Sequence, residues 1–315
     1  MAPRLVVTPG DPRGIGPEVA ARALRAFAIT HPAADVSLLG PEGPLSLDEL
    51  DALAESHRSA ADAVASATVA ARSIERGVRL ALDGAVHAVV TAPLHKPSLH
   101  DAGWPVPGQT EMLAGLAGVE HVGMLMAAER TRLESPLRVL LVTTHLALRD
   151  VPDALTATRL IDQIVVLDRA LRDDWGIDDP RIGVCALNPH ASDGGLFGDE
   201  EARVYAPALR QLRARGVSVF GPLPADTVFS RALSGSFHAV AAPYHDVGMA
   251  AFKTVSFGSG VNVTLGLPFV RTSPDHGTAF DIAGTGRADP SSMLQALTLA
   301  HRLAQNRFDT TSADV

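Results

Sequence analysis

Short apolar runs rich in valine alternate along this chain with longer segments in which apolar residues recur every three or four positions. The short runs predict buried strands, and the longer segments predict amphipathic helices. Their alternation is typical of βα units around a mostly parallel sheet, so the sequence predicts an α/β fold. The predicted strands are residues 4–7, 88–90, 139–142, 181–187, 239–242 and 261–265. The predicted helices are residues 17–27, 59–82, 154–173, 200–215 and 290–306.

Length and charge limit the class of protein. With 315 residues, the chain exceeds the roughly 250–300 residues at which single cores stop growing, which favours two domains or one large α/β unit. The formal net charge is −8, and the sequence has no dense basic run. Both features argue against a nucleic acid or an anionic membrane as the main partner. A small anionic substrate stays compatible, because a local cluster of Arg, Lys or metal can override the net charge.

Cysteine use and hydropathy bear on where the protein works. Cys185 is the single cysteine and lies inside an apolar run, so we interpret it as a buried structural thiol and expect no intrachain disulfide. No run approaches the roughly 20 apolar residues of a membrane span. The apolar stretch near the N-terminus is too short for a signal peptide. We therefore expect a cytoplasmic protein.

Three predicted strands are each followed by a histidine. His145, His190 and His245 come just after the strands 139–142, 181–187 and 239–242. Ligands of open α/β sheets bind beyond the carboxyl ends of strands, and three imidazoles suit a divalent cation with a position left open for substrate oxygen. Each histidine could instead cap a strand or bond a loop, and the pattern alone leaves both interpretations open. Asp246 could orient a ligand, take a proton or be a solvated loop carboxylate.

Two further groups suggest anion binding. Gly10, Gly14 and Gly16 open a predicted helix, where backbone N–H groups could receive a phosphate or carboxylate. Their spacing is not that of the dinucleotide fingerprint, so a tight βα turn is slightly favoured. A second group, Lys253, Asn262 and Arg271, has basic residues that suit phosphate or carboxylate, with a surface ion pair as the alternative.

Several stretches spread over most of the chain carry the motifs of one family. They read Gly-Asp-Pro-Arg-Gly-Ile-Gly-Pro-Glu at 10–18, Thr-Ala-Pro-Leu-His-Lys at 91–96, Thr-Thr-His-Leu-Ala-Leu-Arg-Asp-Val-Pro at 143–152, Leu-Asn-Pro-His-Ala at 187–191, Gly-Pro-Leu-Pro-Ala-Asp-Thr at 221–227, Tyr-His-Asp at 244–246, and the segment 262–271. Together they resemble the 4-hydroxythreonine-4-phosphate dehydrogenase family of vitamin B6 biosynthesis. The resemblance implies a two-domain fold like that of isocitrate and isopropylmalate dehydrogenases, with a mostly parallel sheet and a central cleft. It implies one domain of residues 1–110 plus 266–315, and a second of residues 111–265 that carries most metal ligands and the dimer interface.

The resemblance also implies the chemistry. Family members use NAD to oxidise the C3 hydroxyl of their substrate, and the resulting β-keto acid loses CO2. The site would be shared between the subunits of a homodimer and would hold a divalent metal, zinc before magnesium, cobalt or manganese. The implied metal ligands are His145, His190 and His245. The implied substrate contacts are Gln109, Thr110, Lys253, Asn262 and Arg271, with Lys253 and Asp246 as candidate catalytic residues.

One position departs from the family. This chain reads Gly-Gln-Thr-Glu at 108–111, where the family typically has Gly-His-Thr-Glu. Gln109 can still donate a hydrogen bond, but it cannot carry charge or shuttle a proton. Other substrates therefore stay open, namely a 4-phosphorylated threonate or erythronate, or the cis-dihydrodiol of terephthalate. From another class, a non-catalytic metal- or metabolite-binding protein also stays open.

A second resemblance concerns the cofactor. Residues 276–286 read His-Gly-Thr-Ala-Phe-Asp-Ile-Ala-Gly-Thr-Gly and resemble the adenosine-binding loop of the isopropylmalate and isocitrate dehydrogenases. The carboxylate at the position of Asp281 would accept hydrogen bonds from a ribose 2′-hydroxyl and repel a 2′-phosphate, so NAD is expected rather than NADP. The implied cofactor-binding residues are His276, Gly277, Thr278, Ala279 and Asp281.

Overall fold

The computed structural model describes residues 2–60, 62–256 and 258–308. The chain divides into two compact units. Unit 1 consists of Met1–Glu120 and Val261–Val315, and unit 2 consists of His121–Gly260. The chain therefore leaves unit 1 once, builds unit 2 from one continuous segment, and returns.

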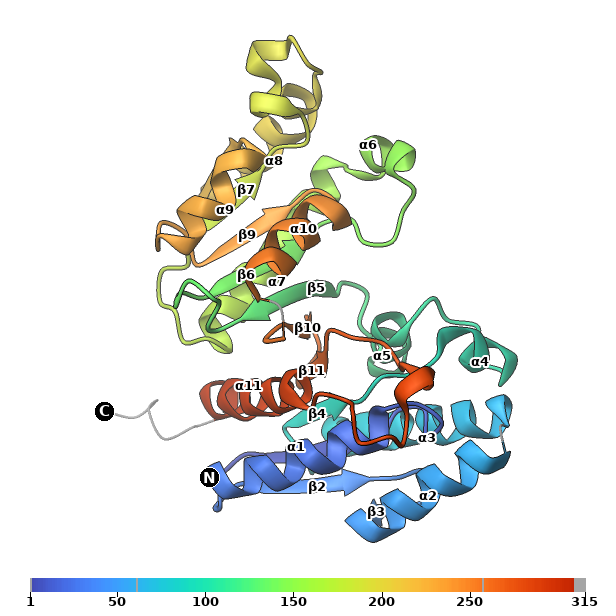
Figure 1. Cartoon of the computed structure of the whole chain (residues 1–315). Coiled ribbons are helices and arrows are strands. Elements are labelled where there is room, and N and C mark those ends of the chain that lie inside the picture. The colour runs from blue at the N-terminus through green and yellow to red at the C-terminus, as the bar shows by residue number, and fades with distance from the viewer. Residues whose placement is uncertain (1, 61, 257, 309–315) are drawn as a thin grey trace. The chain divides into compact units, whose positions relative to one another are not determined.

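Unit 1 contains a mostly parallel sheet (Figure 1). Its strands follow the order β3-β2-β1-β4-β11-β10, in which β1 is parallel to β2 and β4, and β11 is parallel to β4. Only β3 and β10 run antiparallel to their neighbours β2 and β11 among the described strands of this unit. The strands are β1 (Arg4–Thr8), β2 (Asp35–Leu39), β3 (Pro44–Leu45), β4 (Ala88–Thr91), β10 (Val261–Leu265) and β11 (Val270–Pro274). The helices are α1 (Gly16–Thr30), α2 (Leu47–Ala60), α3 (Ala63–Leu82), α4 (Lys96–Asp101), α5 (Gln109–Ala117) and α11 (Ser291–Phe308).

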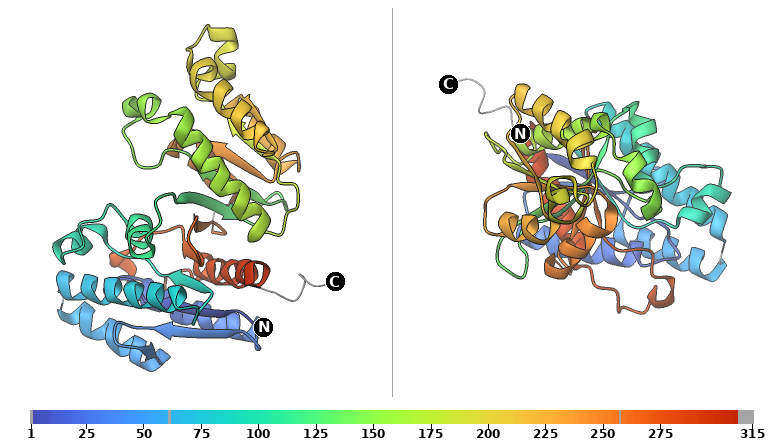
Figure 2. Two further views of the ribbon diagram at one scale, coloured as in Figure 1. Left: turned by 180° about the vertical axis from the view of Figure 1, so that it is seen from behind. Right: turned by 90° about the horizontal axis from the view of Figure 1, so that it is seen from above.

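Helices cover both faces of this sheet. The step from β1 to β2 and the step from β2 to β4 run in opposite directions, so right-handed crossovers place their helices on opposite faces. Figures 1 and 2 show this arrangement, with α1 packed beside α11 on one face and α3 against β1, β2 and β4 on the other. Both faces of β1 and β4 are consequently buried, which explains why their sequences read as continuous apolar runs.

Unit 2 repeats the architecture with the strand order β5-β6-β9-β7-β8. Strands β6, β9, β7 and β8 are parallel, and β5 is antiparallel to β6. The strands are β5 (Gly123–Ala128), β6 (Leu137–Leu141), β7 (Ile182–Cys185), β8 (Val219–Leu223) and β9 (Ala239–Ala242). The helices are α6 (Val151–Ala154), α7 (Ala157–Asp173), α8 (Ala206–Ala214), α9 (Ala225–Leu233) and α10 (His245–Ser256). A core cluster joins β5, β6 and β9 to Phe229 of α9 and Phe252 of α10.

The α/β fold and all of the predicted strands are confirmed, as β1, β4, β6, β7, β9 and β10. The prediction of one helix over residues 59–82 is wrong, because α2 ends at Ala60 and Asp62 caps α3 by accepting from Ala65 N at 2.9 Å. The helix predicted from residue 154 begins at Ala157, where Thr156 caps it in the same way. No helix in the described part of the chain is long and apolar enough to span a membrane.

Candidate functional site

The predicted residues fall into two groups, one in each unit. In unit 2, the loops that follow β6 and β9 are tied together, because Thr143 N and Thr143 Oγ1 both donate to Pro243 O, at 3.2 and 2.7 Å. These loops carry His145 and His245, whose ring centres lie 5.4 Å apart. The two strands are parallel neighbours, so their carboxyl ends meet at one edge of the sheet. The structure therefore brings these two predicted ligands together.

This ring distance suits a shared cation. Two imidazoles that bind one metal ion through nitrogen at about 2.1 Å hold their ring centres roughly 5 Å apart. The ring of His245 is also oriented, because its Nδ1 lies 2.7 Å from Asp246 Oδ1. A carboxylate partner on Nδ1 leaves Nε2 as the nitrogen available to a metal. The imidazoles of His145 and His245 therefore suit a shared divalent cation.

Helix α10 arranges the other predicted residues of this group. Asp246 lies in its first turn, so the interpretation as a loop carboxylate is wrong, although its side chain is exposed as a solvated carboxylate would be. Lys253 lies two turns after His245 on the same helix, and this spacing of eight residues places both on one face. One helix therefore presents an imidazole, its carboxylate partner and an ammonium group.

His190 lies on an unusual turn. His190, Ala191, Ser192 and Asp193 all have φ between 44° and 64°, the left-handed region that costs L-residues about 1–2 kcal/mol each. The turn that contains them, Pro189–Gly195, follows β7 and exposes His190. Within the described residues, no three His, Cys, Asp or Glu side chains converge into a group that could hold a metal. One chain thus supplies two neighbouring imidazoles and a third elsewhere.

A buried carboxylate anchors that turn. Glu201 Oε1 accepts from the backbone N–H groups of Leu187 and Asn188, at 3.0 and 2.8 Å. Glu201 Oε2 accepts from Asn188 Nδ2 at 2.9 Å, and Glu200 shares the same amide. These contacts fix the chain immediately before the strained residues. Glu201 could not be singled out from the sequence, because nothing in its local pattern distinguishes it from a surface glutamate.

In unit 1, the predicted substrate residues gather around Arg271 on β11. Its side chain is buried, its Nη1 donates to Thr264 Oγ1 at 2.9 Å, and its Nη2 donates to Thr91 Oγ1 at 2.7 Å and to Gln109 Oε1. Gln109 Oε1 also accepts from Thr91 Oγ1 at 2.6 Å. The structure brings Gln109 and Arg271 into contact and adds Thr91 and Thr264, to which no role was assigned from the sequence.

This cluster is electrostatically incomplete. None of the hydrogen-bond partners of Arg271 among the described residues is a carboxylate, and burial lowers the pKa of its guanidinium to about 10, partly offset by the negative charge of Glu111. Arg271 Nε and Asn262 Oδ1 are buried without a partner in the described structure. Thr110 lies next to Gln109, buried at the start of α5. A buried cation with an orphaned donor is suited to an anion.

The glycine-rich loop after β1 forms a tight turn. A side chain at Gly10 would lie 2.2 Å from Pro93 O, and one at Gly14 would lie 2.6 Å from Thr278 O. Only glycine allows these backbones to approach so closely, which supports the βα-turn interpretation. The loop packs against residues 276–282, because Ile15 N donates to Thr278 O at 2.9 Å.

The predicted cofactor residues lie on that second loop. His276 Nε2 is buried and has no partner in the described structure, whereas Asp281 is exposed. Gly277 is exposed, Thr278 is buried, and Ala279 has a left-handed φ of 41°. An orphaned imidazole nitrogen and an accessible carboxylate on one loop fit the hydroxyl and amine groups of an adenosine.

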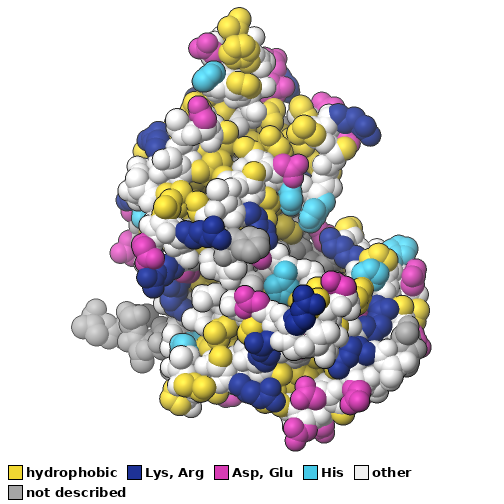
Figure 3. Space-filling model, viewed as in Figure 1, with side chains coloured by type: hydrophobic (Ala, Val, Ile, Leu, Met, Phe, Trp, Pro, Cys, Tyr) yellow, Lys and Arg dark blue, Asp and Glu magenta, His cyan; other side chains and the backbone are white. Residues whose placement is uncertain are grey.

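Charged side chains of both signs lie on the face of the molecule that Figure 3 shows. Among the described residues visible in Figure 3, Lys and Arg side chains are interspersed with Asp and Glu, and no extended basic field forms.

Comparisons with known proteins agree on one family. A family model described as pyridoxal phosphate biosynthetic protein PdxA matches residues 11–300. A 4-hydroxythreonine-4-phosphate dehydrogenase from Burkholderia vietnamiensis is 42% identical over 323 aligned residues, which cover 96% of this chain and 97% of that protein. The crystal structure of a 4-hydroxythreonine-4-phosphate dehydrogenase from Klebsiella pneumoniae matches with a TM-score of 0.79 at 38% identity, covering 96% of this chain and 100% of that one.

Structures of more distant proteins are also similar to this chain. A terephthalate 1,2-cis-dihydrodiol dehydrogenase from Burkholderia xenovorans matches with a TM-score of 0.66 at 25% identity, covering 96% of this chain and 98% of that one. An isocitrate dehydrogenase from Methylococcus capsulatus matches with a TM-score of 0.51 at 14% identity, covering 96% and 86%. The last likeness concerns the fold alone, and it confirms the predicted isocitrate dehydrogenase-like class.

Proposed function

This chain belongs to the pyridoxal phosphate biosynthetic protein PdxA family, and on that premise we propose that it is an NAD-dependent, divalent-metal-dependent dehydrogenase of 4-hydroxythreonine 4-phosphate. The substrate is an amino acid with a secondary hydroxyl and a phosphate. The observation that carries the proposal is the buried guanidinium of Arg271, which has only neutral hydrogen-bond partners among the described residues.

Unit 1 would bind the phosphate and the cofactor. Arg271 supplies positive charge, and Thr91 and Thr264 hold its fork in place from two other strands. Gln109 and Thr110 stand beside it, and Asn262 adds an unpaired acceptor for a hydroxyl or ammonium group. The loop of His276, Gly277, Thr278, Ala279 and Asp281 would hold the adenosine of NAD. When bound, NAD supplies the acceptor for the hydride that leaves C3.

Unit 2 would act on the reacting hydroxyl. His145 and His245 would hold the cation, and the contact of Asp246 with His245 Nδ1 leaves Nε2 as the nitrogen for the metal. A divalent cation supplies positive charge that makes a nearby hydroxyl more acidic. Lys253 would neutralise the substrate carboxylate, whose later loss as CO2 follows from the β-keto acid product. Zinc suits an imidazole site best.

His190 would complete the set from a second copy of the chain. It is exposed and stands apart from the other two imidazoles. Large apolar side chains are exposed on the two loops concerned, with Leu148 66% exposed beyond His145 and Leu196 72% exposed beyond His190. Exposed apolar side chains of this kind favour a protein contact. A homodimer that exchanges these loops accounts for both observations. A cytoplasmic location stays a prediction from the sequence.

The decisive experiment follows NADH formation with candidate substrates side by side, in buffer with zinc and after chelation. We expect turnover of 4-hydroxythreonine 4-phosphate that disappears on chelation and returns with the metal. Preferential turnover of threonate or erythronate 4-phosphate, or of terephthalate cis-dihydrodiol, would replace the substrate and keep the enzyme class. NAD-linked turnover that survives complete metal removal would overturn the metal dependence.

A further inference from the structure

The segment 189–197, which contains His190, is tied to the rest of unit 2 through Asn188. Among the described residues, every hydrogen bond of this segment stays within it or goes to Asn188. Ala191 N donates to Asn188 O at 3.2 Å, and Phe197 N donates to Ser192 O inside the segment at 3.1 Å. Backbone strain such as that of its four left-handed residues persists only where the surroundings fix the chain, and it is concentrated at functional sites. The position of His190 therefore depends on Asn188.

Glu201 binds Asn188 through both its backbone and its side chain. One carboxylate oxygen accepts from Asn188 N at 2.8 Å and from Leu187 N, and the other accepts from Asn188 Nδ2 at 2.9 Å. Glu201 is 5% exposed, although its neighbours Ala202 and Arg203 are exposed. Hydrogen bonds to an ionised group are shorter and stronger than neutral ones. The carboxylate thus fixes the residue through which the segment of His190 is tied down.

The support for this carboxylate comes from outside the loop. Glu201 begins a π-helix, Glu201–Tyr205, that leads directly into α8. Glu201 lies on the buried side of this helix together with Val204 and Tyr205. Such π-helices are rare and are frequently found at functional sites. The packing of a helical element in the core therefore sets where the carboxylate stands, and the loop follows it.

The far end of the loop returns to the same amide at Gly198. This glycine has a φ of +130°, and a side chain there would lie 2.6 Å from Asn188 Nδ2 and 2.7 Å from Glu200 Oε2. Glu200 Oε2 accepts from Asn188 Nδ2 at 2.7 Å. Only glycine allows so close an approach with this backbone conformation. Both ends of the loop consequently meet at Asn188, and His190 lies between them.

We propose that Glu201 is a positioning residue for His190: acting through Asn188, its carboxylate sets where the loop presents the imidazole to the metal. Glu201 does not bind the metal itself, because its two oxygens are engaged with Leu187 and Asn188 in the interior of unit 2. This inference rests on the proposed function, in which His190 completes the metal site of a second copy of the chain.

The first test measures zinc binding to the full-length protein in competition with a chelating dye. Glu201→Ala raises the dissociation constant about 10- to 100-fold, the range for a lost partner behind a metal ligand. Glu201→Gln restores most of the affinity, because its amide oxygen still accepts from the backbone N–H groups of Leu187 and Asn188. Gly198→Ala disturbs the same amide from the loop and also weakens zinc binding, so the test stands even where Glu201→Ala does not fold.

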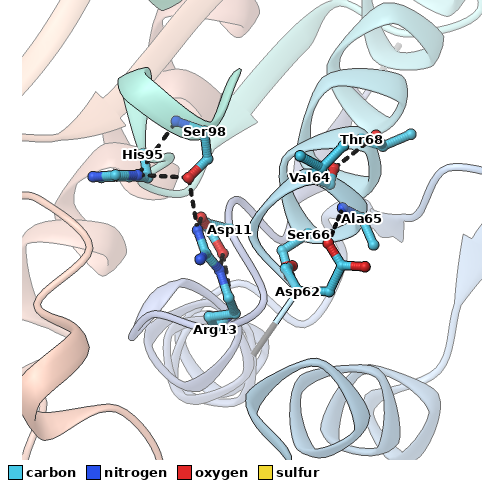
Figure 4. A network of polar contacts seen from close by, with 9 residues as sticks. All are labelled: Asp11, Arg13, Asp62, Val64, Ala65, Ser66, Thr68, His95 and Ser98. Carbon is cyan, nitrogen blue, oxygen red and sulfur yellow. Dashed lines mark hydrogen bonds and ion pairs between the residues drawn. The ribbon is translucent and has the colours of Figure 1, made fainter. Parts of the chain in front are cut away.

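Two controls separate positioning from general stability and from charge. Asp62, in unit 1, also accepts from a backbone N–H, that of Ala65 at the start of α3 (Figure 4). Asp62→Ala removes this cap and lowers the free energy of unfolding, but it leaves zinc affinity unchanged. Asp199→Asn removes an exposed carboxylate close to Glu201 that pairs with Arg203, and it also leaves zinc affinity unchanged.

Mixed dimers identify the imidazole on which Glu201 acts. Glu201→Ala refolded together with His245→Ala recovers about a quarter of wild-type NADH formation, because half of the random dimers carry one intact site of two. Glu201→Ala refolded with His190→Ala recovers nothing beyond its parents, since both changes damage the same half of the site. The zinc concentration is chosen to fill the wild-type site alone.

The outcomes separate this role from the proposed function. Wild-type zinc affinity in Glu201→Ala and Gly198→Ala would overturn the positioning role while leaving the metal site intact. An equal loss of affinity in Asp62→Ala would contradict it too, because the effect would then follow stability. Recovery with His190→Ala in place of His245→Ala would assign Glu201 to the other half of the site. No zinc binding by the wild-type protein would overturn the metal site and the role of Glu201 together.

Discussion

Replacing Arg271 by methionine should separate stability from ligand binding. Burial lowers the pKa of this guanidinium from 12.5 to about 10. At about 1.4 kcal/mol per pKa unit, the charged form is disfavoured in the fold by roughly 3 kcal/mol. The pKa values of Arg271 in the unfolded chain, 12.5, and in the fold, about 10, both lie above neutral pH. The destabilisation from burying the charged guanidinium is therefore fully present at pH 7 and fades only as the pH rises above about 10. Methionine is an unbranched side chain without charge, so Arg271→Met removes this destabilisation.

The variant loses bonds as well as the charge. Thr91 keeps its bond to Gln109, whereas Thr264 loses the guanidinium as a partner, a loss of about 1–2 kcal/mol. We therefore expect Arg271→Met to leave the free energy of unfolding of unit 1 unchanged or raise it by about 1–2 kcal/mol. The same change should weaken binding of inorganic phosphate by at least about tenfold, because its charge-assisted hydrogen bonds disappear.

Tryptophan fluorescence during urea unfolding can follow unit 1 alone. The protein has two tryptophans, Trp104 in unit 1 and Trp175 in unit 2, so a Trp175→Phe background leaves Trp104 as the reporter. Phosphate binding is measured on the same pair of proteins by calorimetry. A loss of stability above about 2 kcal/mol together with unchanged phosphate affinity would refute the reasoning, since it would assign Arg271 to the core rather than to a ligand.

Three other substitutions or reactions test neighbouring features. Gln109→His should make sulfate bind more tightly as the pH falls below about 6, because the imidazole gains charge beside Arg271; a pH-independent affinity, as expected for the wild-type protein, would contradict this. Asp246→Asn should raise the dissociation constant for zinc about 10- to 100-fold in competition with a chelating dye, because His245 loses its orienting carboxylate. Its control is Asp226→Asn, an equivalent change in the first turn of α9, and equal zinc affinities in both variants would argue against the role of Asp246. Cys185 should resist thiol reagents at pH 8 in the native protein and react after unfolding, since burial raises the pKa of its thiol to about 12; rapid native labelling would contradict its burial.

The repeating βα pattern made much of the fold predictable. Strands such as β4 and β9 are buried on both faces, and their apolar runs are strong local signals. The same pattern placed His145 and His245 at strand ends. It could not reveal that β9 lies between β6 and β7, because strand order depends on pairings between residues far apart in sequence.

Other features have no local signal. Strand β11 was not among the predicted strands, since Arg271 interrupts its apolar character and is accommodated by Thr91, Thr264 and Gln109 from other elements. The left-handed turn at His190 was equally hidden, because non-glycine residues of any type rarely adopt positive φ, and four consecutive ones do so here. In both cases, tertiary contacts override the local preference.

Subunit complementation tests the central claim, that imidazoles from two copies of the chain hold one catalytic cation. His190→Ala and His245→Ala are each expected to be inactive as homodimers. Mixed after unfolding and refolding together, they should recover about a quarter of wild-type NADH formation, because half of the random dimers carry one intact site of two. A mixture as inactive as its parents, despite confirmed heterodimers, would contradict a site shared between subunits.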